Sequence, residues 1–218
     1  MLARFLDPAV TSLKICGVVN ASDALLLVEQ NIDALGINFW PQSKRYIAPA
    51  DAAGFLADIA GQILRVGVFV NADPELPLQL FADGLIDLAQ FHGDESPAYC
   101  AAMAASGLPF IKALPALPDS LADAHLYGAQ AILIDTPAPG TYGGTGEIFD
   151  WSIASDFIKN HPQIPVILAG GITAENAARA VAEVRPAAID VASGAESSPR
   201  HKDLAKVCQI RNCLEPTR

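Results

Sequence analysis

The segment Ile164-Pro-Val-Ile-Leu-Ala-Gly-Gly-Ile-Thr173 is followed by a helical run and then by Ala187-Ala-Ile-Asp-Val-Ala-Ser-Gly-Ala-Glu196. Each segment holds a short apolar run that leads into glycine. Residues 165–169 are too few for a globular helix, and such a run is typical of a strand buried on both faces. The pattern predicts two parallel strands joined by a helix, with Thr173 as its N-cap and Glu175 in its first turn.

The glycine ends of these two strands predict an anion site. Gly170 and Gly171 let backbone amides approach an anion because no Cβ stands in the way. The second run ends with amides and a hydroxyl at Ser193 and Gly194. Adjacent glycine-ended strands are typical of a phosphate cradle, and in an eight-stranded βα barrel the loops after strands seven and eight usually form one. The alternative is that these glycines only make tight turns.

Working outward, the same strand–helix unit recurs along the chain every 20 to 30 residues, roughly, the size of a βα unit. The other strands are expected at residues 12–16, 34–39, 64–70, 87–92, 109–113 and 130–135. The other helices are expected at residues 22–30, 49–60, 74–82, 96–105, 120–127, 152–159 and 202–213, the first with Ser22 as its cap.

This alternation predicts a closed (βα)8 TIM barrel, one domain over residues 1–218, because eight parallel strands can close without a free edge. An open doubly wound sheet is the alternative, but no Gly-x-Gly-x-x-Gly follows the first strand.

Composition narrows the class of protein. The 218 residues are 51% apolar, which is enough for a large core, and carry a formal charge of −10. The absence of a basic run argues against nucleic-acid binding. No run of about 18 apolar residues exists to span a membrane, and the first ten residues lack the apolar core of a signal peptide. The four cysteines show no CxxC pair and no metal-ligand spacing, which predicts reduced thiols and a cytoplasmic location.

Polar residues inside barrel strands point to an active site, because such strands are normally apolar on both faces. Lys14 and Cys16 share one face of the first strand, and Gln90 shares a face with His92. Asp135 ends the sixth strand after Ile-Leu-Ile.

A lone buried cysteine is usually inert. Cys16, however, ends a strand beside Lys14, whose ammonium would favour a thiolate able to take a proton. Asp135 is either a loop-capping carboxylate or the acid that faces this base across the barrel mouth. Lys14 and Asp190 are candidates for a buried ion pair, because the first and eighth strands adjoin in a closed barrel. For His92 we favour a satisfied buried histidine over a catalytic one.

Together these residues carry a family resemblance that covers nearly the whole chain. The motifs, in order, are Lys14-Ile-Cys-Gly17, Gly67-Val-Phe-Val-Asn71, Gln90-Phe-His-Gly-Asp-Glu95, Asp135 followed by Gly143-Gly-Thr-Gly146, Phe149-Asp-Trp151, Leu168-Ala-Gly-Gly171 with Asn176, and Asp190-Val-Ala-Ser-Gly194. The chain resembles phosphoribosylanthranilate isomerase. The resemblance implies a (βα)8 enzyme of tryptophan biosynthesis that needs no cofactor or metal. It further implies a small phosphorylated substrate, and other enzymes of the pathway as candidate partners.

The resemblance also implies roles for single residues. It places the general base on Cys16, the general acid on Asp135, and the arginine that meets the anthranilate carboxylate on Arg45. The phosphate loops fall on Gly170, Gly171, Ser193 and Gly194, and the loop over the substrate on Gly143, Gly144 and Gly146.

The chain departs from the family pattern at three places. Lys44 replaces a proline and leaves the rigidity of its loop in question, since proline fixes φ. Ala192 replaces a serine, and Thr136 replaces an alanine after the acid.

The implied reaction is an Amadori rearrangement. Asp135 protonates the ribose ring oxygen, the ring opens to a Schiff base, and Cys16 removes the proton from C2. Asp135 must begin protonated and Cys16 ionised, which calls for a lowered pKa of Cys16. Another phosphosugar barrel enzyme, such as an epimerase or indole-glycerol-phosphate synthase, would share the cradle but not the pair. A non-catalytic phosphosugar-binding barrel would have no use for the pair.

Overall fold

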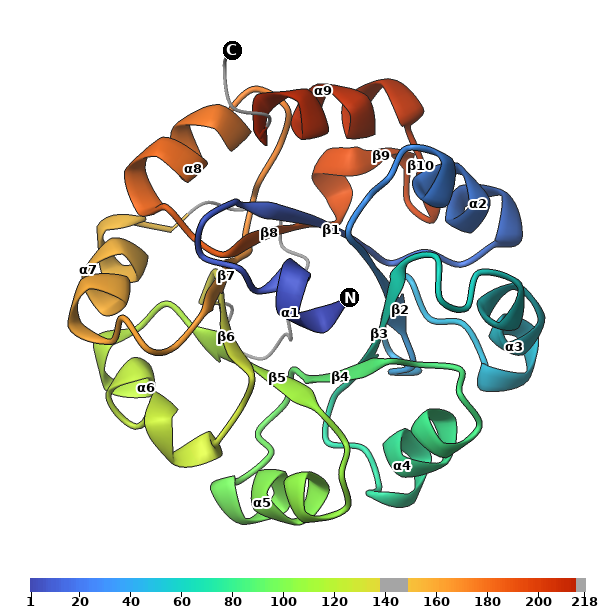
Figure 1. Cartoon of the computed structure of the whole chain (residues 1–218), viewed down its shortest axis with the longest axis horizontal. Coiled ribbons are helices and arrows are strands. Elements are labelled where there is room, and N and C mark those ends of the chain that lie inside the picture. Colours follow the sequence, from blue (N-terminus) through green and yellow to red (C-terminus); the bar gives the residue numbers. More distant parts are fainter. Residues whose placement is uncertain (138–148, 215–218) are drawn as a thin grey trace.

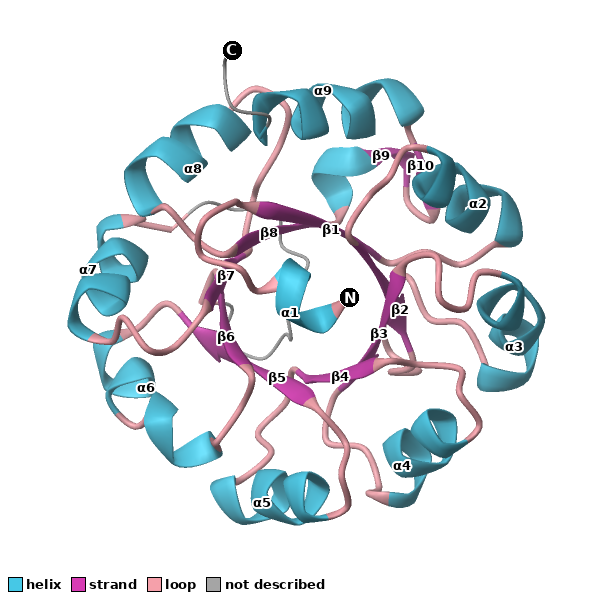
Figure 2. Cartoon of the chain, viewed as in Figure 1, coloured by secondary structure: helices cyan, strands magenta, loops and turns pink. Residues whose placement is uncertain are grey.

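A computed structural model describes residues 1–137 and 149–214. Eight parallel strands form a closed barrel in chain order, and helices surround it (Figures 1 and 2). The strands are β1 Ser12–Cys16, β2 Ala34–Asn38, β3 Leu64–Phe69, β4 Leu88–Phe91, β5 Phe110–Pro115, β6 Ala131–Asp135, β7 Val166–Leu168 and β8 Ala188–Val191. The predicted (βα)8 barrel is confirmed.

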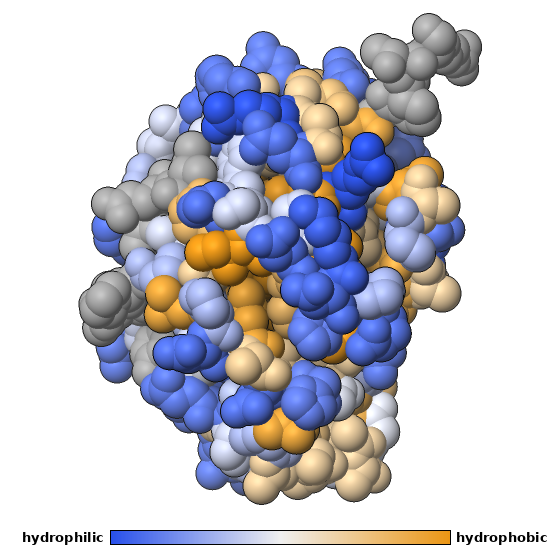
Figure 3. Space-filling model, turned by 90° about the vertical axis from the view of Figure 1, so that its left-hand side faces the viewer, coloured by the Kyte–Doolittle hydropathy of each residue, from blue (hydrophilic) through white to orange (hydrophobic). Residues whose placement is uncertain are grey.

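The outer helices follow the strands one by one. They are α2 Ala21–Glu29, α3 Pro49–Asp58, α4 Glu75–Ala82, α5 Pro97–Ala105, α6 Pro118–Ala122, α7 Ser152–Asn160, α8 Ala177–Val184 and α9 Leu204–Leu214. Hydrophilic and apolar side chains are mixed on the surface of the molecule, as Figure 3 shows for one side. In the described part of the chain, no helix has both the length and the apolar character needed to cross a membrane.

Two layers of apolar side chains hold the barrel. Alternate strand residues such as Leu13 and Ile15 pack outward against the helices. The intervening residues, such as Leu64, Leu88 and Leu133, fill the barrel interior. This alternation follows from the two-residue period of a strand. It also places Lys14 and Cys16 on the interior side, opposite to Leu13 and Ile15.

The two ends of the barrel differ. The short helix α1, Leu2–Phe5, lies over one opening (Figure 1), and Phe5 packs with the interior residues. The sequence patterns did not predict this helix. The polar ends of the strands open at the other end, where a chain with this topology carries its site.

Several local predictions are wrong. The cap of α2 is Asn20, whose side chain accepts a hydrogen bond from the amide of Asp23, rather than Ser22. Helix α8 begins after Asn176, so Thr173 and Glu175 lie in the preceding loop. The helix expected at residues 120–127 is divided into α6 and the 3-10 helix Ala124–Tyr127. The 3-10 helix Ser193–Ala195 and the hairpin of β9 Glu196–Ser198 and β10 His201–Lys202 were not predicted.

Candidate active site

A cavity of about 410 Å³ opens at the carboxyl ends of the strands. Most of the residues proposed from sequence lie on its wall, namely Cys16, Arg45, Asp135, Gly170, Gly171 and Ser193. Gln90, His92 and Asp190 line it too. Gly194 is absent from this wall. It packs against the carbonyl of Ile172, where a Cβ would collide. Gly143, Gly144 and Gly146 lie outside the described residues.

The surroundings of Cys16 combine charge and burial. Lys14 Nζ lies 2.8 Å from Asp190 Oδ1, which confirms the predicted ion pair between β1 and β8. Burial alone would lower the pKa of Lys14, but the charges of Asp190 and Cys16 outweigh it and raise that pKa. The Lys14 ammonium also hydrogen-bonds with the Cys16 sulfur. Lys14 is therefore a fixed positive charge beside the thiol.

The predicted lowering of the Cys16 pKa is wrong. Burial raises the pKa of this thiol, and Asp190 raises it further, whereas Lys14 and Lys202 act in the opposite direction. Burial dominates because a thiolate taken out of water loses more hydration than the two ammonium groups replace. In the absence of substrate these surroundings therefore favour the neutral thiol.

Arg45 is held by Glu196, a residue for which the sequence suggested no role. Its Nε and Nη2 atoms donate to the two carboxylate oxygens of Glu196, each at 2.7 Å. Lys202 Nζ donates to the same carboxylate at 2.9 Å and to the backbone carbonyl of Cys16 at 2.6 Å. The hairpin after β8 thus connects the predicted carboxylate-binding arginine to the predicted base.

Charge explains why this cluster is stable. Burial alone would raise the pKa of Glu196, but the hydrogen bonds from Arg45 and the charge of Lys202 lower it, so the carboxylate stays ionised. Burial lowers the pKa of Lys202 despite the opposing effect of Glu196. Glu196 and Lys202 lie more than 150 residues beyond Arg45 and Cys16, so no local sequence signal pairs them.

The backbone conformation and the surroundings of position 17 explain why a glycine follows Cys16. Its φ is +80°, and a Cβ at this position would collide with Cδ of Arg45. The arginine side chain therefore passes directly over the backbone next to Cys16. Lys44, its neighbour, is exposed and also lines the cavity.

Asp135 lies at the end of β6 with its two oxygens in different surroundings. Oδ1 accepts a hydrogen bond from the amide of Thr136 at 2.8 Å, and Oδ2 lies 3.3 Å from Nε2 of His92. His92 Nδ1 is 2.9 Å from the amide nitrogen of Gln90. The side chain of His92 is 17% exposed and lines the cavity, so the prediction of a buried histidine is wrong.

The loop after β7 contains two glycines in the left-handed backbone conformation. Gly170 and Gly171 have φ of +81° and +61°. A Cβ on Gly170 would collide with Oγ1 of Thr136, so the threonine of this chain fits only because position 170 is glycine. Asn176 Nδ2 donates to the carbonyl of Gly171 at 2.9 Å, and Asn176 Oδ1 accepts from the amide of Thr173 at 2.8 Å. The loop is therefore fixed from the start of α8.

Known proteins are similar to this chain in sequence and in fold. The family model for N-(5'-phosphoribosyl)anthranilate (PRA) isomerase matches residues 13–212. An N-(5'-phosphoribosyl)anthranilate isomerase of Trichlorobacter lovleyi is 40% identical over 205 residues, which are 93% of this chain and 97% of that protein.

Solved structures agree. The phosphoribosyl anthranilate isomerase of Thermotoga maritima superposes with a TM-score of 0.85 at 34% identity, over 95% of this chain and all of that one. A phosphoribosyl anthranilate isomerase in complex with reduced 1-(o-carboxyphenylamino)-1-deoxyribulose 5-phosphate has a TM-score of 0.81 at 33% identity, over 95% of this chain and all of that one. The chain belongs to the N-(5'-phosphoribosyl)anthranilate isomerase family.

Proposed function

We propose that this chain converts N-(5'-phosphoribosyl)anthranilate to 1-(2-carboxyphenylamino)-1-deoxyribulose 5-phosphate in tryptophan biosynthesis, with Cys16 as general base and Asp135 as general acid. One observation carries the proposal. A thiol at the end of β1 and a carboxyl group at the end of β6 line the same cavity, next to the glycine loop after β7. A cavity that only bound a phosphosugar would not need this pair.

The chemistry begins at Asp135. Its proton passes to the ribose ring oxygen, the bond from that oxygen to C1 breaks, and an iminium forms at C1. Cys16 then removes the proton from C2, and the electron pair moves into the iminium to give an enolamine. The enolamine tautomerises to the ketone.

The positive charge of the iminium also stabilises the thiolate of Cys16. The pKa of the thiol is raised by burial, with Lys14 as the nearest opposing charge. A new positive charge on the substrate favours the thiolate further, because an opposite charge within about 4–6 Å stabilises the charged form. Cys16 is a thiolate while Asp135 holds the one proton of the pair, and ring opening stabilises that thiolate for the second step.

The substrate is oriented by its two anionic ends. We place the phosphate at the amides of Gly170, Gly171 and Ser193, and the anthranilate carboxylate at Arg45. Glu196 occupies the Nε–Nη2 edge of the guanidinium, which leaves the edge with Nη1 for a second carboxylate. The phosphorylated ligand in the related solved structure supports a small phosphorylated substrate.

Three further proposals accompany the reaction. We place the protein in the cytoplasm, because all four cysteines are unpaired. We expect residues 1–218 to act as one domain. Contacts with other enzymes of tryptophan biosynthesis are proposed from family membership alone.

The test follows loss of the fluorescence of phosphoribosylanthranilate. Wild type should turn the substrate over, while Cys16→Ser and Asp135→Asn should each lower kcat by about 100-fold or more, the usual scale of general acid–base catalysis. Inorganic phosphate should still compete with substrate in both variants, because the loops after β7 and β8 are unchanged. Near-normal kcat in either variant would remove that residue from the mechanism.

A further inference from the structure

A chain of three side chains runs from β4 to β6 beneath the cavity. The amide nitrogen of Gln90 lies 2.9 Å from Nδ1 of His92, and Nε2 of His92 lies 3.3 Å from Oδ2 of Asp135. When the amide nitrogen donates to Nδ1, the neutral imidazole carries its proton on Nε2, directed at the carboxyl group. His92 therefore contacts the oxygen of Asp135 that the amide of Thr136 does not occupy.

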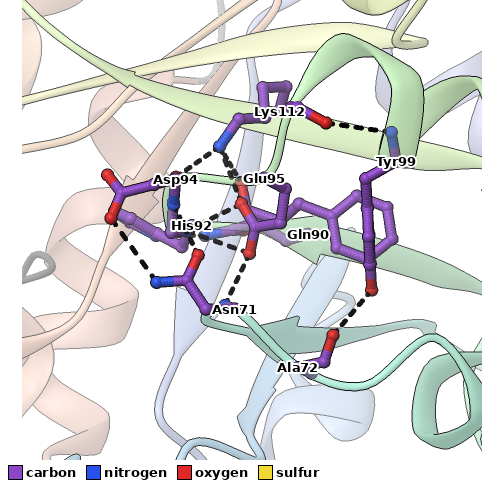
Figure 4. A network of polar contacts seen from close by, with 11 residues as sticks. Asn71, Ala72, Gln90, His92, Asp94, Glu95, Tyr99 and Lys112 are labelled. Carbon is purple, nitrogen blue, oxygen red and sulfur yellow. Dashed lines mark hydrogen bonds and ion pairs between the residues drawn. The ribbon is translucent and has the colours of Figure 1, made fainter.

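The backbone beside His92 is rigidly held. Figure 4 shows Glu95, which belongs to the loop that follows β4, between Lys112 and Asn71. Lys112 Nζ donates to the carbonyl of Gly93 at 2.7 Å, and Glu95 accepts from the amides of Gly93 and Asn71, each at 2.9 Å. The two charges lie 2.9 Å apart with side chains 2% and 1% exposed. The buried ion pair thus fixes the backbone from which the side chain of His92 projects.

Gln90 is unusual because it is 1% exposed, yet its Oε1 has no hydrogen-bond partner among the described residues. A buried polar atom without a hydrogen-bond partner destabilises the folded state by about 1–3 kcal/mol. Proteins rarely keep such an atom unless it has a function. Rotation of the amide by half a turn exchanges its oxygen and nitrogen without changing its shape. The nitrogen suits the neutral imidazole that is protonated on Nε2, and the oxygen suits Nδ1–H, both in the imidazolium and in the neutral ring that remains after Nε2 gives up its proton. Gln90 can therefore support both charge states of His92.

We propose that His92 is a positioning residue that returns a proton to Asp135 in every catalytic cycle, with Gln90 as its switchable support. The inference rests on the proposed function. After Asp135 has given its proton to the ring oxygen, it is a carboxylate. The imidazolium Nε2 then passes a proton to Oδ2 and becomes neutral, and the ring takes up a new proton from water in the open cavity.

The protons balance over the cycle. C2 and the enol hydroxyl each release one proton, while the ring oxygen and C1 each take one up. The rearrangement therefore needs no reactant besides substrate and solvent water. His92 only moves a proton to the place where the next turnover requires it.

Several other ionisable groups surround the imidazole of His92. They are Asp135 on β6, Lys112 on β5, Asp94 and Glu95 in its own loop, and Cys16 and Asp190 on the cavity wall. Lys112 and Glu95 neutralise each other, as do Lys14 and Asp190. Asp135 is thus the carboxyl group in direct contact with the ring among the described residues.

A substrate-free NMR experiment tests the contact. The imidazole 15N signals of His92, assigned by their loss in His92→Gln, are compared at one pH in wild type and in Asp135→Asn. The Nε2 signal should move in Asp135→Asn, because the group in contact with Nε2 changes from a carboxyl group to an amide. The Nδ1 signal should move in Gln90→Glu, because the group in contact with Nδ1 changes from an amide to a carboxyl group. Unchanged signals in both variants would overturn the proposal.

Kinetics test the proton transfer. His92→Gln places an amide nitrogen near the position of Nε2, so it keeps a donor to Asp135 but carries no mobile proton. We expect kcat to fall between about tenfold and 100-fold with KM within twofold, a smaller loss than that of an acid itself. Gln90→Met, which has a similar volume and makes no such hydrogen bond, should lower kcat in the same direction.

Each failure has its own signature. Wild-type kcat in His92→Gln, or a change confined to KM, would overturn the proposal, because a purely structural or binding role predicts those results. Absence of isomerase activity in wild type would instead overturn the proposed function. The NMR experiment uses no substrate and would still decide whether His92 and Asp135 are coupled.

Discussion

At the scale of single residues, Cys16 and Asp135 share one proton, and the reaction needs that proton on Asp135. The reaction needs the thiolate with the protonated carboxyl group. That form holds the same number of protons as the thiol with the carboxylate, so the pair titrates as a unit. The pH dependence of the enzyme therefore reports when the pair loses its last proton.

The raised pKa of Cys16 sets this limit. Burial holds the thiol protonated to higher pH than a free cysteine, so the singly protonated pair persists into the alkaline range. We expect kcat/KM to stay level through neutral pH and to fall only above about 8.5, the value of an unperturbed thiol. A pH series of initial rates measures this. In Cys16→Ser, the residual kcat/KM should show no decrease at alkaline pH. A decrease of the wild-type kcat/KM that starts well below about pH 8.5 would contradict the assignment of Cys16 as the base.

Arg45 and Glu196 give a second prediction at this scale. Glu196→Gln keeps one acceptor but loses the charge that holds the guanidinium by two bonds at 2.7 Å. We expect KM for substrate to rise about tenfold, the difference between a charge-assisted pair and a neutral hydrogen bond. Inorganic phosphate, which lacks the carboxylate, should keep its inhibition constant. Equal losses for substrate and phosphate would mean that Glu196 supports the loops and not Arg45.

The sequence identified the residues that bear the chemistry better than those that hold them. Cys16 and Asp135 were recognisable because each ends an apolar strand. The pair of Lys14 and Asp190 followed from closure of the barrel. Glu196 and Lys202 were missed, because their partners lie far away in sequence and their hairpin has no apolar pattern. The direction of the Cys16 pKa was also missed, since burial depends on the whole fold.

At the scale of elements, the loop between β4 and α5 depends on a buried ion pair. Lys112 faces away from the barrel interior, where its ammonium bonds Glu95 and the carbonyl of Gly93. A strand residue with this orientation normally packs against a helix as an apolar side chain. The pair has a positional task here, which is to hold the loop that carries His92.

Unfolding in urea tests this pair. Lys112→Met leaves the carboxylate of Glu95 buried without its counterion, so we expect the free energy of unfolding to fall by about 3–5 kcal/mol. Glu95→Gln combined with Lys112→Met should be less destabilised than Lys112→Met alone, because the remaining amide oxygen can still accept from the backbone. If the double variant is the less stable of the two, the charge of Glu95 is not the source of the loss.

Boundaries of elements were less predictable than their existence. Both Asn20 and Ser22 are good caps, and the structure uses Asn20 because its oxygen reaches the amide of Asp23. Asn176 takes the position expected for Thr173, because the amide of Thr173 itself donates to Asn176. Short polar residues close together compete for the same role, and only the path of the backbone decides between them.

At the scale of the whole molecule, net charge opposes the proposed substrate. The chain carries −10, and Lys14, Arg45 and Lys202 are already paired with carboxylates. Long-range attraction therefore contributes little to capture of a phosphorylated anion. Short-range amide donors must supply the affinity.

Ionic strength tests this balance. Between about 0.01 and 0.15 M salt the Debye length falls from about 30 to 8 Å, so the repulsion is screened and kcat/KM should rise about twofold. Glu29→Lys with Asp58→Lys, at exposed C-terminal ends of α2 and α3, should flatten this response without touching the site. A steep fall of kcat/KM with salt would show that cationic steering dominates.

The hairpin after β8 has a consequence during synthesis of the protein. Its Lys202 donates to the backbone carbonyl of Cys16 from a position 186 residues further along the chain. A ribosome that adds about 5–20 residues per second needs roughly 10–40 s to reach the second residue after making the first. Through that interval the thiol of Cys16 meets any oxidant in its compartment without the neighbours that the folded barrel places around it, because the hairpin contact can form only after residue 202 has left the ribosome.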